Sequence, residues 1–308
     1  MVKFYAMQEG RIRESSSFSK DCIIYVINPT GDEIHMLSSL LNFDPDYITD
    51  PLDSDERARI DIDDNITEII VKIPYMDTED QKITYKTVPL GTILGENFIL
   101  FVSRYPVRFL EKMVEQNRLN PKKRSQMIFQ IFYRNALLFL SYLKEINKIS
   151  DKAEEKLHES MRNSELEVLM YLEKSLVFFT TSLRSNEIVM ERILRGNIIQ
   201  IYEEDRELLE DTIVENKQAL EMANIYSDIL SGMMDAFASV ISNNLNVVMK
   251  ILTVVTIIMQ IPTIIASFYG MNVGLPFQDN PLTWVFMITW SVIGGIVAIY
   301  WFKKKKWI

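Results

Sequence analysis

The pattern of hydrophobic and polar positions changes character twice along this chain. The first part alternates short runs of β-branched and aromatic residues with polar turns, a pattern that is typical of strands. We predict strands at residues 22–27, 68–73, 83–88 and 98–102. A helical pattern follows the first of them, at residues 32–41. Strands and helices in this order predict an α/β domain, to which we assign residues 1–120.

From residue 121 onwards the apolar residues recur every three or four positions, which is the period of an amphipathic helix. No proline interrupts this pattern between Pro121 and Pro262. We therefore predict long helices, packed as antiparallel pairs, over residues 121–245.

Two uncharged segments lie near the C-terminus. Residues 251–269 and 282–302 hold 19 and 21 residues without a formal charge, and about 20 residues cross the hydrocarbon core of a bilayer. We predict a membrane domain at 246–308, with spans at about 246–269 and 282–302, an outer loop at 270–281 and a basic tail at 303–308. The loop has no Lys or Arg, whereas the tail has four lysines. The positive-inside rule then places both termini in the cytoplasm, so we expect a multi-pass protein of the cell (inner) membrane, in contact with lipid.

The first span carries polar residues whose spacing keeps them on one side of a helix. Successive members are 3, 4, 3, 4, 3 and 4 residues apart, and the set is Asn246, Met249, Thr253, Thr256, Gln260, Thr263 and Ser267. Threonine and serine in a span often bond their own helix or join helices together, but Gln260 at mid-membrane in the same register favours a water-lined path. The register runs back to Asp228, which predicts one continuous helix into the membrane. Two helices cannot enclose a pore, so we expect a homo-oligomer.

Composition and charge narrow the classes of function. A net charge of −9 argues against a nucleic-acid partner, because affinity for nucleic acid comes from neutralised phosphates. Neither of the glycine-rich phosphate motifs is present, so we predict no nucleotide partner. With two histidines and one cysteine, Cys22, the chain offers no disulfide framework and no paired catalytic motif. We therefore predict that the protein is not an enzyme.

The loop between the spans begins with Gly270, Met271 and Asn272, directly after Tyr269. A Gly-Met-Asn tripeptide in this place resembles the signature of the CorA family of divalent-cation channels, and the resemblance extends along most of the chain. It implies an N-terminal α/β domain, a helical stalk and two spans per subunit, in a funnel-shaped homopentamer around one axis. It also implies that Gly270, Met271 and Asn272 form a selectivity filter, in which Asn272 recognises a hydrated Mg²⁺ ion.

Further roles carry over from the same resemblance. Asn246 matches a polar ring at the inner end of the pore, and Met249 and Leu252 match a hydrophobic gate where dewetting blocks ions. Asp211 matches a residue that binds a regulatory Mg²⁺ between neighbouring subunits, and we choose Asp77 as its partner.

Together these features predict a Mg²⁺ channel that takes up hydrated divalent cations along the membrane potential and is gated by cytosolic Mg²⁺. The chain departs from the family at Gln260, where an apolar gating residue is common, so we expect a wetter constriction. A transporter of Co²⁺, Ni²⁺ or Zn²⁺ is the first alternative, although zinc prefers nitrogen and sulfur ligands and His35 and His158 lie far from the spans. A non-conducting two-span sensor or scaffold is the second alternative, and its polar residues would not share one face.

Overall fold

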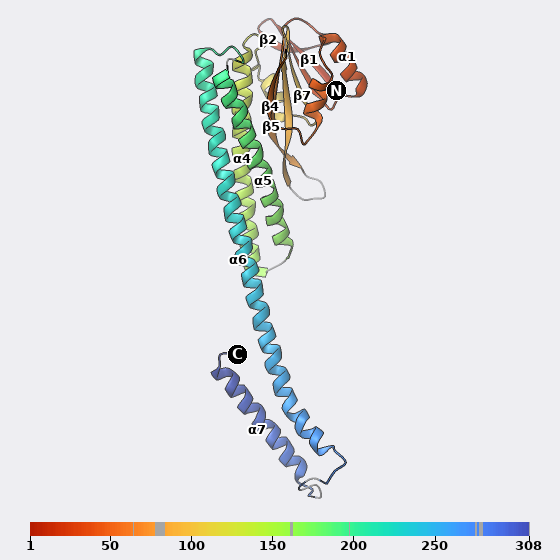
Figure 1. The fold of residues 1–308 in the computed structure, drawn as a ribbon, viewed down its shortest axis with the longest axis vertical. Helices are drawn as coiled ribbons and strands as arrows, with labels where there is room; N and C mark the ends of the chain where they lie inside the picture. Colours follow the sequence, from red (N-terminus) through yellow and green to blue (C-terminus); the bar gives the residue numbers. More distant parts are fainter. Residues whose placement is uncertain are drawn as a thin grey trace. The chain divides into compact units, whose positions relative to one another are not determined.

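The structure is a computed structural model that describes residues 1–63, 65–77, 84–160, 163–196, 198–274, 276 and 280–307. The chain divides into two compact units, Met1–Gly232 and Met233–Ile308. Figure 1 traces the elements of each unit along the sequence.

The first unit is built on a seven-stranded sheet with the strand order β2-β1-β3-β7-β6-β5-β4. Its strands are β1 (Val2–Gln8), β2 (Arg11–Ser15), β3 (Cys22–Ile27), β4 (Arg59–Asp63), β5 (Ile66–Asp77), β6 (Thr84–Leu94) and β7 (Phe98–Ser103). Strands β3 and β7 are parallel, and the other neighbouring strands are antiparallel.

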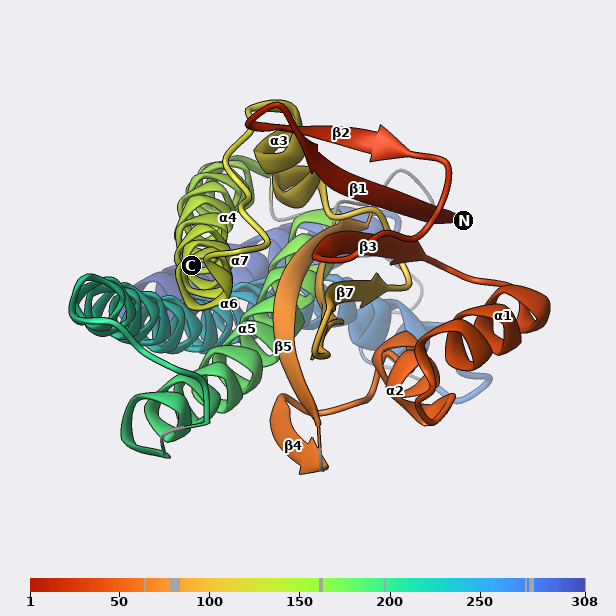
Figure 2. The ribbon, with the colours of Figure 1, turned by 90° about the horizontal axis from the view of Figure 1, so that it is seen from above.

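Helices cover both faces of this sheet, as Figure 2 shows. One face carries α1 (Gly31–Leu41), α2 (Asp46–Thr49) and the short 3-10 helix η1 (Asp50–Leu52). The other face carries α3 (Arg108–Glu115), α4 (Arg124–Ser160) and α5 (Asn163–Gly196). This mixed sheet between two layers of helices confirms the predicted α/β fold.

Strand β3 shows why some strands could be predicted from the sequence. Ile23 and Tyr25 belong to the core on the α3–α4 side, and Cys22 and Ile24 belong to the core on the α1 side. All six residues of β3 are therefore buried, which explains its continuous apolar run.

The predicted strands agree with the observed ones where apolar residues dominate. Residues 22–27 form β3, residues 68–73 lie within β5 and residues 98–102 lie within β7. The predicted strand at 83–88 falls within β6 from Thr84 onwards, and Ile83 lies outside the described residues. The predicted helix at 32–41 is α1, which begins with a capping box between Thr30 and Glu33. Strands β1, β2 and β4 were not predicted.

The long helices α4 and α5 run in opposite directions, as predicted (Figure 1). Helix α6 (Glu203–Tyr269) packs its first part against both of them. The Ser125 hydroxyl on α4 donates to the Asp205 carboxylate at 2.6 Å, and the Asn216 amide donates to the Leu183 carbonyl on α5 at 2.9 Å. Buried polar groups therefore fix the register between these helices.

Strand β4 pairs with only part of the β5 edge, and two asparagine side chains form hydrogen bonds with the β5 backbone beyond it. Strand β4 pairs only with residues 66–70 of β5, so the backbone of Lys72 has no strand partner on that side. Asn186 on α5 accepts from the Lys72 amide at 2.8 Å and donates to its carbonyl at 2.7 Å, and Asn135 on α4 also donates to that carbonyl at 2.9 Å. A buried sheet edge without such partners would cost the desolvation of its peptide groups.

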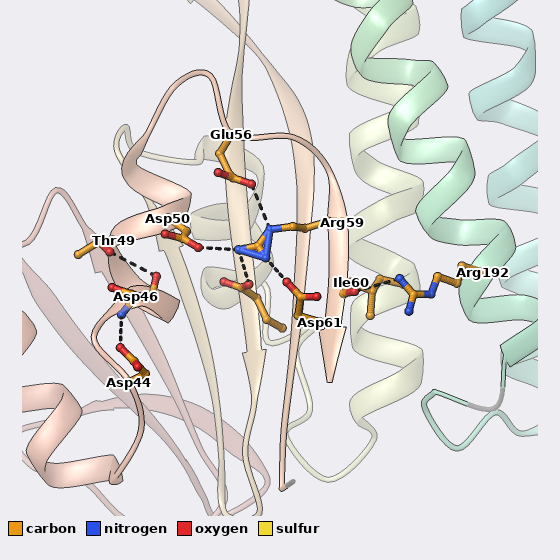
Figure 3. Close-up of polar contacts among 10 residues, drawn as sticks. Asp44, Asp46, Thr49, Asp50, Glu56, Arg59, Ile60, Asp61 and Arg192 are labelled. Carbon is orange, nitrogen blue, oxygen red and sulfur yellow. Dashed lines mark hydrogen bonds and ion pairs between the residues drawn. The ribbon is translucent and has the colours of Figure 1, made fainter. Parts of the chain in front are cut away.

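An ion-pair cluster holds β4 against the loop that precedes it (Figure 3). The guanidinium of Arg59 contacts Asp50 at 2.6 Å, Glu56 at 3.0 Å and Glu68 at 2.9 Å, and it also pairs with Asp61. Glu68 is 1% exposed, and its Oε1 atom has no hydrogen-bond partner. Burial raises the pKa of Glu68 to about 7, and the Arg59 charge opposes that rise only in part.

The second unit contains the end of α6 and the helix α7 (Thr283–Lys304). Helix α6 is 67 residues long and passes without interruption through the boundary between the units, which confirms the predicted continuous helix. Of the predicted outer loop, residues 275 and 277–279 lie outside the described residues.

Candidate functional site

Two helices are long and apolar enough to cross a membrane, namely α6 and α7, with mean hydropathies of 2.1 and 1.9 over their most apolar windows. A core helix of a soluble protein can pass the same test, but such a helix is mostly buried. Here only 6% and 11% of those windows are buried. Large side chains such as Met259, Phe286 and Trp290 are exposed on these helices. Apolar surface of this extent requires a cover, and lipid is the cover that matches the length of both helices.

One face of α6 packs against α7. Val254 is buried, and Ile258, Ile261 and Ile265 are half-buried at spacings of 4, 3 and 4 residues. Gly294 of α7 makes the contact close, whereas a Cβ atom at the adjacent Gly295 would meet its neighbour at an ordinary van der Waals distance. A Cβ atom at Gly294 would lie 2.9 Å from Cγ2 of Ile261, and one at Gly295 would lie 3.9 Å from Cγ2 of Ile258. Small residues let two helices approach in this way in a bilayer, where packing rather than the hydrophobic effect drives association.

The predicted polar stripe lies on a different face of the same helix. Every member is exposed, and the members are Asn246, Met249, Thr253, Thr256, Gln260, Thr263 and Ser267. With 3.6 residues per turn, the stripe is centred about 140° around the axis from the face that contacts α7. The stripe therefore points away from the second span of its own subunit.

The three threonines of the stripe bond to their own helix. Each hydroxyl donates to the carbonyl four residues earlier: Thr253 to Met249 at 2.8 Å, Thr256 to Leu252 at 2.8 Å, and Thr263 to Met259 at 2.9 Å. These bonds use the hydroxyl hydrogens but leave oxygen lone pairs exposed. The stripe thus presents hydrogen-bond acceptors along its threonine positions.

Pro262 lies inside α6 without ending the helix. Its ring nitrogen carries no hydrogen, so the carbonyl of Ile258 loses its usual helical donor. Neighbouring helices and local adjustments tolerate such a proline in a membrane span.

The Gly270-Met271-Asn272 loop begins where α6 ends. The Gly270 amide still donates to Ala266 at 2.9 Å, and the Met271 amide donates to Phe268 at 3.2 Å. Gly270 does not have a positive φ, so left-handed backbone is not the reason for glycine there. The reason is a close approach, because a Cβ atom would lie 3.3 Å from the Ala266 carbonyl oxygen. Met271 and Asn272 are both exposed directly after this turn.

The two residues of the predicted gate lie about one turn apart on α6: Met249 is a member of the stripe, and Leu252 lies beside it. The side chains of Met249 and Leu252 are 52% and 58% exposed, so neither is engaged in the contact with α7. Both are available to meet equivalent side chains from other copies of the chain.

The two predicted regulatory aspartates have different surroundings. Asp77 ends β5, and its carboxylate pairs with the ammonium of Lys86 on β6 at 2.7 Å. Asp211 is exposed on α6. Within the described residues, no group of three or more His, Cys, Asp or Glu side chains is arranged to hold a metal ion.

Comparison with known proteins places this geometry in a family. The model of the family described as CorA-like Mg²⁺ transporter protein matches residues 21–304. The chain belongs to this CorA-like family. Its α/β unit, its continuous α6 and its two apolar helices are thus the family's arrangement rather than a chance combination.

Individual members of the CorA-like family align with nearly the whole chain. The cobalt/magnesium transport protein CorA of Methanocaldococcus jannaschii is 27% identical over 291 residues, covering 91% of this chain and 89% of that protein. The Thermotoga maritima protein of the same name is 24% identical, covering 92% and 83%. The complete structure of the Methanocaldococcus jannaschii CorA magnesium transporter superposes with a TM-score of 0.84 at 24% identity, covering 100% and 99%. This superposition confirms the fold from the sheet to α7.

The sequence analysis did not identify two features of the candidate site, namely the glycine pair in α7 and the ion pair of Asp77. Gly294 forms the close contact between α6 and α7, with Gly295 next to it, and Lys86 neutralises Asp77. A Gly-Gly pair inside an otherwise bulky apolar span was a visible signal for the first. Lys86 gave no signal, because the pairing of β5 with β6 places it opposite Tyr75, from where its side chain reaches Asp77 diagonally.

Proposed function

We propose that this protein is the subunit of a membrane channel that takes up hydrated Mg²⁺ into the cytoplasm, with the membrane potential as its driving force. Five copies are expected to surround one axis, with α6 lining the pore and α7 facing lipid. Both termini lie in the cytoplasm in this proposal. No step of this function requires bond-making chemistry from the protein.

The exposed polar stripe on the face of α6 that points away from α7 is the observation that carries this proposal. Polar side chains at membrane depth face protein or water rather than hydrocarbon. The subunit's own second span does not cover them. Several copies arranged with these faces inward would enclose a water-filled path.

The chemistry of the stripe suits a hydrated cation. Water bound to Mg²⁺ turns its oxygen to the ion and its hydrogens outward, so the surrounding wall must accept hydrogen bonds. The threonine hydroxyls have already donated to their own helix and therefore act as acceptors. Gln260 adds a side-chain carbonyl at mid-span. Such a wall conducts the ion without stripping its waters, which Mg²⁺ gives up reluctantly.

Asn272 is the proposed selectivity residue, with Gly270 and Met271 forming the rest of the filter. A ring of neutral amide oxygens at the outer mouth would bond the hydration shell of Mg²⁺. A ring of carboxylates would bind the ion more tightly and slow its release, since conduction requires binding that is not too strong. The exposure of Asn272 at the end of α6 supports this role.

The driving force explains why a gate is needed. A divalent ion gains about 4.6 kcal/mol in falling through 100 mV, at about 2.3 kcal/mol per charge. Such an energy would accumulate Mg²⁺ on the order of 10³-fold if the pore stayed open. Met249 and Leu252 are the proposed hydrophobic gate, and Asn246 is the proposed polar ring below it.

Cytosolic Mg²⁺ bound between Asp211 of one subunit and Asp77 of the next is the proposed brake on this gate. The Lys86 ammonium forms an ion pair with the Asp77 carboxylate at 2.7 Å, so a Mg²⁺ ion that binds Asp77 must compete with Lys86. Asp211→Lys should therefore leave current flowing at internal Mg²⁺ concentrations that close the wild-type channel. Patch-clamp recording from reconstituted protein would measure this, with Glu210→Lys on the neighbouring exposed position as the control. Unchanged inhibition in Asp211→Lys would remove Asp211 from this role.

Co²⁺ is a second candidate cargo. The relatives from Methanocaldococcus jannaschii and Thermotoga maritima are both named cobalt/magnesium transport proteins. A selectivity filter that bonds the water molecules around the ion, rather than the ion itself, would accept other hydrated divalent ions of similar size.

The test is uptake into vesicles that contain a Mg²⁺-sensitive dye, with an imposed inside-negative potential. Wild-type protein should load the vesicles, and Co²⁺ added outside should compete. Asn272→Ala should lose selective uptake by tenfold or more while keeping its oligomeric state, whereas Val273→Ala, at the next exposed position, should keep both. Normal selective uptake by Asn272→Ala would refute the filter, and no uptake by the wild type would refute the function.

A further inference from the structure

A basic groove runs along the contact between α3 and α4, and none of its lining residues is among those assigned to ion conduction. Three adjoining cavities form it, with volumes of about 370, 430 and 300 Å³. Phe109 and Lys112 line both the first and the third, and Met113, Arg118 and Arg134 line both the second and the third. The cavities therefore form one continuous groove, on the side of the sheet where Figure 2 shows α3 beside α4.

The charge of this groove is unusual for the chain. Four cationic side chains line it, and they are Arg108, Lys112, Arg118 and Arg134. Among the residues that the structure describes, no Asp or Glu lines any of the three cavities, in a protein whose net charge is −9.

The four cations of the groove are not neutralised by neighbours. None of them forms an ion pair with any residue that the structure describes. Helix α3 also carries Glu111 and Glu115, which form no ion pair with these four cations and whose charges help to raise the pKa of Tyr5 on β1. Three of these unpaired cations lie on α3 and α4, and Arg118 lies in the loop that joins the two helices. Four like charges held near one another repel, so an anionic ligand would relieve that repulsion.

The end of the groove at β5 has a different chemistry. Its cavity is lined by Tyr75 and Tyr105, whose rings stack at 4.5 Å between centroids, and by Phe109 and Tyr142. Pro74 and Pro106 add further apolar surface. Its volume falls in the range of small-molecule pockets, which begins at about 300 Å³. This end suits a flat ring system, with Arg108 and Lys112 at its margin.

We propose that this groove binds a nucleoside polyphosphate, with the base in the aromatic end and the phosphates along the four cations. Arginine guanidinium groups bond phosphate oxygens in pairs, and a base gains by contact with aromatic rings. The groove uses neither of the glycine-rich motifs whose absence led us to predict no nucleotide partner. This site shares no residue with the proposed pore and does not depend on the proposed transport function.

The full-length protein in detergent provides the test, through the fluorescence of a ribose-labelled ATP analogue titrated at fixed free Mg²⁺. Saturable binding that unlabelled ATP displaces is expected. Arg134→Gln and Arg108→Gln should each weaken binding about tenfold or more, since each removes a charge-assisted contact. Arg184→Gln removes an equal charge from an exposed position on α5 and should leave the affinity within twofold.

Competition with simpler anions then identifies the ligand class. AMP and inorganic tripolyphosphate should each displace the analogue much more weakly than ATP, because each lacks one half of the proposed contacts. Equal displacement by tripolyphosphate would overturn the nucleotide assignment. Absence of saturable binding at millimolar ATP, or an equal loss in Arg184→Gln, would overturn the site. This experiment measures nucleotide binding and not ion uptake. Failure to bind ATP would therefore not refute the proposed transport function, and failure of the uptake assay would not refute nucleotide binding.

Discussion

The two compact units of this chain differ in where they keep their polar groups. In the first unit, the side chains of Asn135 and Asn186 are buried and bond to the backbone of Lys72 inside the fold. In the second unit, the polar stripe and large apolar side chains are both exposed, on different faces of the same helices. The first unit therefore has a buried core of its own, whereas the exposed faces of the second unit are covered by lipid and by other copies in the proposed channel.

The contact between the two spans offers the strongest way to break this arrangement. Gly294→Leu would force α7 away from Ile261, because even a Cβ atom would lie 2.9 Å from that side chain. We expect ion uptake in vesicles to fall more than tenfold, together with loss of assembled protein. Val297→Leu changes an exposed position on the same helix and should leave both unchanged.

A second substitution separates this close contact from a general defect. Ile261→Ala combined with Gly294→Leu restores room between the helices, so uptake should recover at least in part. Failure of the double variant to recover, with the single Ile261→Ala variant active, would contradict the packing explanation.

Features that depend on a single local sequence pattern could be predicted from the sequence. The stripe on α6 was predicted because its spacing of three and four residues matches the helix, and β3 because both of its faces are apolar. Strands β2 and β4 were missed because edge strands mix charges with apolar residues, as in residues 11–15 and 59–63. Asp61 and Asp63 suggest a turn in the sequence, but they lie within β4, where Arg59 pairs with Asp61.

Features assembled from distant segments could not be predicted from the sequence. The groove brings Tyr75, Tyr105 and Arg134 together from two strand ends and a helix. The threonine hydroxyl bonds also needed coordinates, because a threonine in a helix can either donate to its own helix or turn outward. The roles of Asn272, Asp77 and Asp211 stay predictions.

The smallest effect that we predict is a pH dependence of folding stability in the first unit, caused by its buried Glu68. Glu68 has a pKa of about 7 in the fold because of burial, against about 4.3 when unfolded. The folded state therefore holds a proton that the unfolded state loses, and stability falls as pH rises from about 4.5 to about 7. Above pH 7 this contribution no longer changes.

Glu68→Gln keeps the shape of the protonated side chain and removes its titration. The variant should lose less stability than the wild type between pH 5 and pH 8, by an amount on the order of 3 kcal/mol. Urea unfolding followed by far-UV circular dichroism would measure the difference, with Glu210→Gln at an exposed site as the control. Identical pH slopes for the wild type and Glu68→Gln would contradict this view of the Arg59 cluster.

Accessibility along α6 tests the central claim most directly. Cys22 is the only cysteine and is buried, so its replacement by alanine gives a background for single cysteines. Thr256→Cys and Thr263→Cys lie on the polar stripe, whereas Val248→Cys and Val255→Cys are exposed on another face. In functional vesicles, a charged water-soluble thiol reagent should label the first pair and spare the second. Equal labelling of both faces, or labelling of the valine positions alone, would contradict a pore lined by this stripe.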